Sequence, residues 1–327
     1  MAVTEQLGMG VIGCGGISRA HLPAQRAIEG MRTVAVCDIN EEAARAAAEE
    51  FEVPAVYTDY HDLLADERVQ AVAILLPHHL HRDPAVAAAE AGKHILCEKP
   101  MAISLQQTDD MIAAAQRAGV VLMIGQILRF RPANIRAREL IRDGAIGQLR
   151  NVIRRRYGFA RDYKAEWASK PEQAGGWVLY GFGAHEMDMI LWLSDSEATR
   201  VYAQARRNNP WWNDYDEITV DAGLSNGAMS TYHHSTNSPF GAWDCLLIGT
   251  EGAMVVETER IRLGDQVIEA PLEGPASHIA QSAEFLRAVR EGGEPEASGR
   301  NVRRTMAALE AAKISIAEER VVNAAEL

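Results

Sequence analysis

The sequence predicts a two-domain protein, in which an α/β domain with a doubly wound parallel sheet precedes an α+β domain with a large, mostly antiparallel open sheet. The chain has 327 residues, more than a single domain usually holds. Over the first third, short apolar runs alternate with amphipathic, alanine-rich stretches, a pattern typical of a parallel sheet covered by helices on both faces. After Gly125 the pattern changes to one long helix followed by successive strands. We therefore predict domains at residues 1–125 and 126–327.

The first domain is predicted from hydrophobic periodicity. Its expected strands cover residues 8–12, 33–38, 71–76, 94–97 and 120–124. Its expected helices cover residues 17–29, 41–51, 83–91 and 105–118. Glycines stand where helices are expected to end, at Gly30, Gly92 and Gly119.

The second domain begins with an expected helix over residues 132–143 and a strand over 149–157. A glycine-rich turn leads into a helix over 184–193. From residue 199 to 268 the chain has strand-like segments separated by Asn, Gly and Asp turns. Two final helices are expected over 277–290 and 301–318.

Composition and charge restrict the possible partners. The formal net charge is −12, which argues against nucleic acid or an anionic membrane as a partner. The four cysteines are scattered without metal-ligand spacing, which favours a reducing cytoplasm and no metal site. The chain has no signal-peptide pattern at its start, and its longest apolar run, 71–77, is too short to cross a bilayer.

A glycine-rich loop follows the first predicted strand. Gly13 permits a tight turn, and Gly15 lets the backbone approach a pyrophosphate at the start of the next helix. Ser18 occupies the third position of this fingerprint. Asp38 ends the second strand, where a carboxylate accepts hydrogen bonds from ribose hydroxyls and repels a 2′-phosphate. The loop therefore predicts a Rossmann domain that binds NAD rather than NADP, with Gly16 and Ile17 also at the cofactor.

Lys99 follows the strand 94–97, at the carboxyl end where ligands of such sheets bind. A lysine near an oxidised nicotinamide ring feels a like charge, which lowers its pKa and suits it to share a substrate hydroxyl's proton. A surface lysine with no role is the alternative.

In the second domain, His185 and Asp188 lie one turn apart on one face of a predicted helix. Asp188 is a candidate to support the His185 imidazole as an acid or base. A structural histidine at a helix start is equally compatible with this spacing.

Other polar clusters leave alternatives open. The arginines at 154–156 either face an anionic substrate or form a solvated strand face, because alternate strand residues point outward. His233 and His234 must point to opposite faces, and His234 is a candidate substrate contact. The histidines at 78, 79 and 81 lack the helical spacing and nearby thiolates of a metal site.

Several motifs in order along the chain resemble the Gfo/Idh/MocA family of NAD(P)-dependent sugar and cyclitol oxidoreductases. They are Gly13-Cys14-Gly15-Gly16-Ile17, Ala91-Gly92-Lys93-His94 with Glu98-Lys99-Pro100, Arg129-Phe130-Arg131-Pro132, Gly144-Ala145-Ile146-Gly147, Gly183-Ala184-His185 with Asp188, and Gly249-Thr250-Glu251-Gly252. Together they cover nearly the whole chain.

The resemblance implies a pocket between the two domains for a small polyol or sugar, and a homodimer or homotetramer formed through the C-terminal sheet. It implies that Lys99 and His185 are catalytic. Pro77 and His81 match a loop near the cofactor, and Glu98 matches the residue near the nicotinamide ribose. Further candidates for substrate contact are Arg129, Tyr163, Trp167 and His234.

One position departs from the family pattern. Many family dehydrogenases have an Asp four residues before the His, where this chain has Gly181. Asp188, Tyr163, Tyr180 or water is expected to take over part of that proton relay. The departure keeps two alternatives open beside a dehydrogenase: a glycoside-cleaving enzyme that oxidises its substrate transiently with tightly bound NAD, and a non-catalytic NAD(H)-sensing protein.

Overall fold

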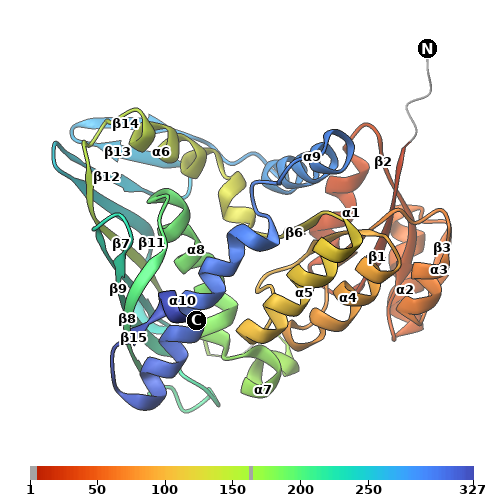
Figure 1. The fold of residues 1–327 in the computed structure, drawn as a ribbon, viewed down its shortest axis with the longest axis horizontal. Coiled ribbons are helices and arrows are strands. Elements are labelled where there is room, and N and C mark those ends of the chain that lie inside the picture. The colour runs from red at the N-terminus through yellow and green to blue at the C-terminus, as the bar shows by residue number, and fades with distance from the viewer. Residues whose placement is uncertain (1–5, 162–164) are drawn as a thin grey trace. The chain divides into compact units, whose positions relative to one another are not determined.

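The computed structural model describes residues 6–161 and 165–327, which form two compact units (Figure 1). The first unit comprises Met1–Ala102, Gln106–Ile127 and Gly274–Val302, and the second comprises Ile103–Leu105, Leu128–Glu273 and Arg303–Leu327. The predicted boundary after residue 125 lies near Ile127, where the first-unit segment Gln106–Ile127 ends. The segment 274–302 returns to the first unit, although it was predicted in the second domain. An amphipathic helix pattern shows that a helix has a buried face, but it does not show which sheet or helix covers that face.

Within the described residues, the first unit contains a six-stranded sheet with the order β3-β2-β1-β4-β5-β6, all parallel. Its strands are β1 (Leu7–Ile12), β2 (Met31–Cys37), β3 (Ala55–Tyr57), β4 (Ala71–Ile74), β5 (His94–Cys97) and β6 (Leu122–Ile124). Its helices are α1 (Ser18–Arg26), α2 (Glu41–Phe51), α3 (Tyr60–Ala65), α4 (Arg82–Glu90), α5 (Leu105–Ala118) and α9 (Ala276–Glu291). The strand order is that of a Rossmann domain, and it reverses between β1 and β4, where such sheets bind their ligands.

The first unit agrees closely with its hydrophobic pattern. β1 and β4 are buried along their whole length, as strands covered on both faces must be. β3 and α3 were not predicted, because a three-residue strand and a six-residue helix are too short to show periodicity. In the folded chain, α9 packs against α1.

Within the described residues, the second unit contains a nine-stranded sheet with the order β14-β13-β12-β11-β7-β10-β9-β8-β15. Its strands are β7 (Leu149–Phe159), β8 (Ala198–Arg206), β9 (Glu217–Leu224), β10 (Met229–Ser235), β11 (Asn237–Gly249), β12 (Ala253–Val256), β13 (Arg260–Leu263), β14 (Gln266–Glu269) and β15 (Val322–Asn323). β10 and β7 pair in parallel, and the other neighbours pair antiparallel.

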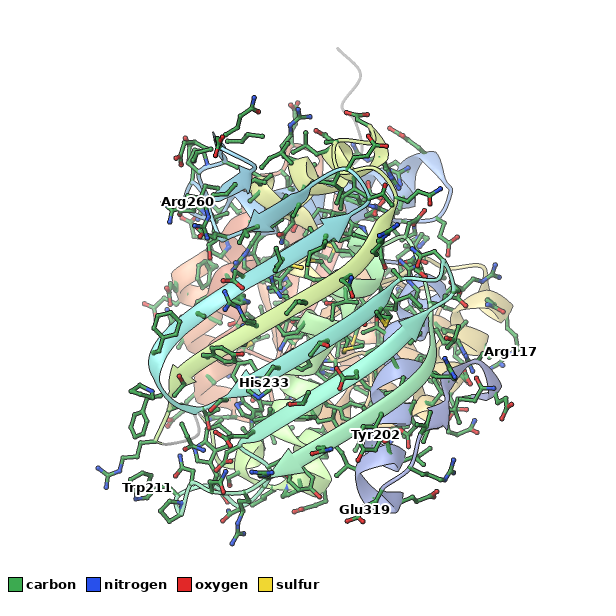
Figure 2. All side chains as sticks on the ribbon, turned by 90° about the vertical axis from the view of Figure 1, so that its left-hand side faces the viewer. Arg117, Tyr202, Trp211, His233, Arg260 and Glu319 are labelled. Carbon is green, nitrogen blue, oxygen red and sulfur yellow. The ribbon has the colours of Figure 1, made fainter. Side chains whose placement is uncertain are left out.

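Helices cover one face of this sheet. They are α6 (Pro132–Arg142), α8 (Gly183–Leu193) and the second-unit part of α10 (Gly299–Glu318), with the short helices η2 (Ile127–Phe130), η3 (Glu166–Ser169), α7 (Pro171–Ala174), η4 (Trp177–Phe182) and η5 (Ala324–Glu326) nearby in the chain. α8 is buried on nearly all sides and contacts β7 and β10. Figure 2 looks onto the opposite face of the sheet, which carries Tyr202 and His233.

The glycine-rich segment before α8 is more regular than its sequence predicts. It was expected to be a turn, but Trp177–Phe182 forms a π-helix that runs directly into α8. π-helical turns are rare and are found often at functional sites. In the described part of the chain, no helix is both long enough and apolar enough to cross a membrane.

Candidate functional site

The glycine loop after β1 has two kinds of glycine. Gly13 adopts a φ of +101°, and a Cβ there would lie 2.4 Å from the backbone oxygen of Leu75, so the fold itself requires glycine. A Cβ on Gly15 or Gly16 would meet no atom within 4 Å. These two glycines are therefore not needed by packing, and the open backbone above them fits the close approach of a pyrophosphate. Ile17, the N-cap residue of α1, is exposed beside them.

Asp38 lies at the end of β2 and organises the same loop. Its two carboxylate oxygens accept hydrogen bonds from the backbone N–H groups of Cys14, at 2.8 Å, and Asn40, at 2.9 Å. The side chain is half-buried, so lone pairs of the carboxylate remain available to a ribose diol. Burial and the Asp38 charge raise the pKa of the Cys14 thiol to about 12, so this cysteine is not a thiolate nucleophile.

Glu98 directly follows β5 and is buried. Its Oε1 lies 2.8 Å from Nε2 of His21 on α1, and its Oε2 accepts the N–H of Lys99 at 3.1 Å. Burial alone would raise the pKa of Glu98, but the hydrogen bond and charge of His21 hold it below its usual value. A Cβ on Gly125 would lie 2.9 Å from Oε1, so that glycine makes room for the carboxylate. His21 was not predicted; its only signal was a histidine on the helix that follows the glycine loop.

His81 fastens the segment after β4 to the segment that follows Lys99. The imidazole is fully buried, with Nδ1 2.8 Å from the backbone oxygen of Pro100 and Nε2 2.8 Å from that of Leu76. Burial lowers its pKa. Pro77 begins the short turn η1 (His78–Leu80) directly before it. Lys99 is half-buried. Its own backbone N–H is bound by Glu98, and the carbonyl of the next residue, Pro100, is bound by His81.

His185 lies in the first turn of α8, in the second unit, and is half-buried. Within that unit, two buried carboxylates, Glu186 and Asp188, fix the same helix. Both are fully buried.

The Asp188 carboxylate binds Arg129 of η2. Arg129 donates from Nε at 2.8 Å and from Nη2 at 2.6 Å, and the hydroxyl of Thr305 donates at 3.0 Å. The side chains of both charged residues are 0% exposed. Asp188 was predicted to support the His185 imidazole, and Arg129 to contact the substrate. The structure pairs them with each other instead, and helix spacing alone does not reveal a partner from another element.

Glu186 was not predicted. It accepts hydrogen bonds from Arg154, from Arg156 at 3.0 Å and from the Trp243 indole at 3.1 Å. Arg155 points to the other face of the sheet and pairs with Asp244. The arginine run is therefore not one solvated face: Arg154 and Arg156 bind Glu186 on one side of the sheet, and Arg155 binds Asp244 on the other.

A row of aromatic rings begins beside η4. Trp167 and Trp177 have ring centroids 5.4 Å apart, Trp177 and Phe182 5.6 Å, and Phe182 and His234 4.8 Å. His234 is buried against the Tyr232 hydroxyl, and burial together with Arg156 lowers its pKa to about 3. The row thus ends in a neutral imidazole. Tyr163, another predicted substrate contact, lies outside the described residues.

Gly181 lies inside the π-helix, where its N–H points to the backbone oxygen of Gly176. Tyr180 is buried and donates its hydroxyl to Glu310 at 2.7 Å, which ties it to α10. An unpredicted carboxylate lies near the start of η4: a Cβ on Gly176 would be 3.2 Å from Oδ2 of Asp214. Burial raises the pKa of Asp214 above its usual value.

Comparison with known proteins gives consistent matches. Residues 7–126 match the family GFO_IDH_MocA, described as "Oxidoreductase family, NAD-binding Rossmann fold", and residues 135–255 match GFO_IDH_MocA_C3, described as "GFO/IDH/MocA C-terminal domain". A D-apiose dehydrogenase from Paraburkholderia graminis is 30% identical over 95% of this chain and 88% of its own length.

Two further similar proteins are named for other reactions or substrates, one as a hydratase and one as a dehydrogenase of levoglucosan. A 2,7-anhydro-N-acetylneuraminate hydratase from Mediterraneibacter gnavus is 28% identical over 77% of this chain and 68% of its own length. A levoglucosan dehydrogenase solved with NADH and levoglucosan is 25% identical, with a TM-score of 0.91 over 98% of this chain and the whole of that one.

Proposed function

The chain belongs to the GFO/IDH/MocA family of NAD-binding oxidoreductases, and we propose that it transfers hydride between a secondary alcohol of a sugar, glycoside or cyclitol and NAD, with Lys99 and His185 handling the hydroxyl proton. It is a dehydrogenase or reductase acting on CH–OH groups, and its cofactor is NAD. The assignment of roles to individual residues is the proposal.

The observation that carries the proposal is the cofactor cradle of the first unit. The glycine loop leaves Gly15 and Gly16 uncovered, and Asp38 presents a carboxylate beside them. We assign the pyrophosphate to this loop, the adenosine ribose to Asp38 and the nicotinamide ribose to Glu98. NAD supplies the hydride acceptor at C4 of its nicotinamide ring, and the protein supplies position and proton transfer.

Lys99 is the proposed proton acceptor for the reacting hydroxyl. Its backbone is fixed by two buried hydrogen-bonded groups, so the side chain extends from a rigid base. A positively charged nicotinamide near a lysine favours the neutral amine, which can take a proton from the substrate.

His185 is the proposed second group at the same hydroxyl, with Trp167 and His234 as substrate contacts. The buried Asp188–Arg129 pair is assigned to holding α8, not to proton transfer. The aromatic row beside η4 presents ring faces that suit the apolar C–H face of a sugar.

A second candidate function is cleavage or hydration of a glycoside through transient oxidation by retained NAD. Gly181 in place of the family's Asp favours it, as does the similarity to a protein named as a hydratase. NAD that copurifies, with product formed but no net NADH, would establish this route.

We also propose a homodimer or homotetramer through the open face of the C-terminal sheet, and a reducing, cytoplasmic setting. Among the described residues of its own unit, no helix covers the sheet face that carries His233 and Tyr202 (Figure 2). The four cysteines, all in the described ranges, are free.

The direct test offers the protein a broad panel of sugars, glycosides and cyclitols. Oxidation is monitored through the absorbance of the reduced nicotinamide, once with NAD and once with NADP. We expect NAD reduction with at least one member. In Lys99→Met we expect kcat to fall by about 10²–10⁴-fold while the Kd for NADH changes little. Lys93→Met, four residues before β5 ends, serves as the matched control. Full activity in Lys99→Met would overturn the role of this lysine.

A further inference from the structure

An arginine cluster in the second unit carries more positive charge than its own carboxylate balances. Arg154 and Arg156 both bind Glu186, and a third guanidinium, that of Arg131, adds to them. The guanidinium carbons of Arg131 and Arg156 each lie 4.5 Å from the Trp243 ring centroid, and that of Arg154 lies 5.9 Å away. The Trp243 N–H also binds Glu186. The guanidinium carbons of Arg131 and Arg156 therefore lie at most about 9 Å apart, which is twice the 4.5 Å that separates each of them from the ring centroid.

The surrounding acids do not supply the missing negative charge. Glu257, which lines a small cavity with Arg131 and Arg154, is paired with Arg260 and Arg262. The larger groove beside the cluster is also lined by Glu259 and Glu269. With these two included, the six arginines at positions 131, 154, 155, 156, 260 and 262 face five carboxylates, those of Glu186, Asp244, Glu257, Glu259 and Glu269. Burial and the charges of Arg154 and Arg156 lower the pKa of Arg131 although the Glu186 charge opposes them, as expected where like charges outnumber their counterion. By contrast, Arg155 has its own carboxylate, Asp244, at 2.5 Å. A cluster with surplus guanidinium groups stabilises a bound anion through charge-assisted hydrogen bonds.

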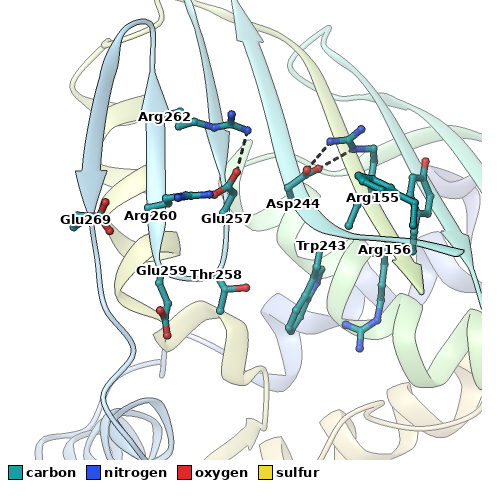
Figure 3. A pocket seen from close by; sticks show the side chains of 14 residues that line it. Arg155, Arg156, Trp243, Asp244, Glu257, Thr258, Glu259, Arg260, Arg262 and Glu269 are labelled. Carbon is teal, nitrogen blue, oxygen red and sulfur yellow. Dashed lines mark hydrogen bonds and ion pairs between the residues drawn. The ribbon is translucent and has the colours of Figure 1, made fainter. Parts of the chain in front are cut away.

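The cluster is reachable from outside. Arg156, whose side chain is 25% exposed, and Trp243 line an open groove of about 840 Å³ together with Tyr157, Phe240 and Thr258. In Figure 3, Trp243 and Arg156 extend side by side, while Arg155 and Asp244 pair on the other side of the strands. A ligand in this groove can reach Arg156 without displacing the Arg155–Asp244 pair.

Arg156 also contacts the aromatic row that is proposed to bind the sugar. Its guanidinium carbon is 4.4 Å from the Phe182 ring centroid, and Phe182 is in contact with His234. Glu186, the carboxylate that Arg156 binds, directly follows His185 in α8. The surplus charge therefore stands at the end of the aromatic row, next to the helix turn that carries the proposed catalytic histidine.

We propose that this enzyme selects sugars that bear an anionic group, a carboxylate or a phosphate, and that Arg156, reinforced by Arg131, receives that group. The inference rests on the proposed oxidation of a sugar hydroxyl and names the class of sugar. The anion accepts hydrogen bonds from the guanidinium N–H groups, while the aromatic row contacts the C–H face of the ring. No covalent step is added.

The test compares matched sugars in the cofactor-loaded protein: glucose, glucuronate, gluconate and glucose 6-phosphate, with their inositol and galactose counterparts. We expect anionic members to have a kcat/KM at least tenfold above their neutral analogues. Preference for the acids identifies a carboxylate, and preference for the phosphates identifies a phosphate; either supports the proposal. Equal or better turnover of the neutral sugars overturns it while leaving the proposed function intact.

Arg156→Met removes the receiving group. We expect its KM for the anionic sugar to rise about tenfold or more, with kcat changed much less and with no rise for a neutral sugar. Arg131→Met, which leaves every hydrogen bond of Glu186 in place, should change KM in the same direction by less. Arg155→Met is the control, because this arginine lines the same groove but is already balanced by Asp244. An equal effect on neutral and anionic sugars, or an equal effect of Arg155→Met, would assign the cluster a structural role only.

Calorimetry separates this inference from the proposed function. Titration of the anionic and neutral sugar into the protein with NADH gives affinities that need no turnover. If no sugar in the panel is oxidised, the proposed function fails, yet tight binding of the anionic sugar that Arg156→Met abolishes still supports the anion site. Absence of such binding overturns the inference.

Discussion

The glycine loop of the first unit and helix α8 of the second are built by opposite means. The loop presents backbone at a helix start: two uncovered glycines, with one carboxylate beside them. α8 is held by buried charged side chains, with Asp188 on Arg129 and Glu186 on Arg154 and Arg156. The glycines of the loop are encoded within a few consecutive residues, and only its carboxylate, Asp38, comes from further along the chain. A side-chain site depends on partners tens to more than a hundred residues away, so its pairing is invisible in a local motif.

The buried pair gives the largest expected effect. Arg129→Met leaves Asp188 buried without its cation, which should lower the free energy of unfolding by about 3–5 kcal/mol. Replacing both partners, Arg129→Met with Asp188→Leu, should restore much of that loss, because two apolar side chains of similar size need no counterion. Thermal and urea unfolding measure the difference. A double variant as unstable as the single one would show that the pair's specific hydrogen bonds, including that of Thr305, are what the fold needs.

The two kinds of loop glycine give the next effect. Gly13→Ala should lower stability by about 1–3 kcal/mol, since a Cβ there would overlap the Leu75 carbonyl and the φ is positive. The Cβ added by Gly15→Ala would meet no atom within 4 Å, so the melting temperature should hardly change. The Kd for NADH should rise, because the same Cβ would stand where the pyrophosphate is proposed to approach the backbone. Thermal unfolding and NADH fluorescence titration of the two variants test this contrast. Unchanged NADH binding in Gly15→Ala would remove this residue from the proposed pyrophosphate site.

A smaller, pH-dependent effect is expected at Glu98. Because His21 keeps the folded-state pKa of this carboxyl below its usual value, Glu98 contributes stability above that usual value, and the contribution is lost as the pH falls through the lowered pKa. In His21→Phe the largest interaction that opposes burial is removed and only Lys99 still opposes it, so the pKa of Glu98 rises. The stability lost on acidification should therefore become smaller than in the unmodified protein. Melting temperatures measured from neutral pH to about pH 4 should show this smaller loss, with exposed His61→Phe as the control. Parallel profiles for both variants would contradict the coupling of His21 to Glu98.

The parts of the molecule that could be predicted from sequence are those encoded by consecutive residues, and the parts that could not are those that depend on distant partners. The parallel sheet, the glycine loop and the segment Glu98-Lys99-Pro100 were predicted because each is a continuous pattern. The return of segment 274–302 to the first unit and the π-helix before α8 were not, since nothing in their local sequence indicates either. Asp188 was predicted at the site from helix spacing, and Arg129 from the family motif. Neither signal indicated that the two side chains bind each other.

The most direct test of the central claim follows the hydrogen itself. A sugar that the enzyme oxidises is prepared with deuterium on the carbinol carbon, and the nicotinamide released after turnover is examined by mass spectrometry. Direct hydride transfer to NAD predicts one deuterium in each reduced nicotinamide formed, and slower turnover of the labelled sugar if transfer limits the rate. Deuterium returned to the sugar product without net NADH, or lost to solvent, would contradict the dehydrogenase assignment.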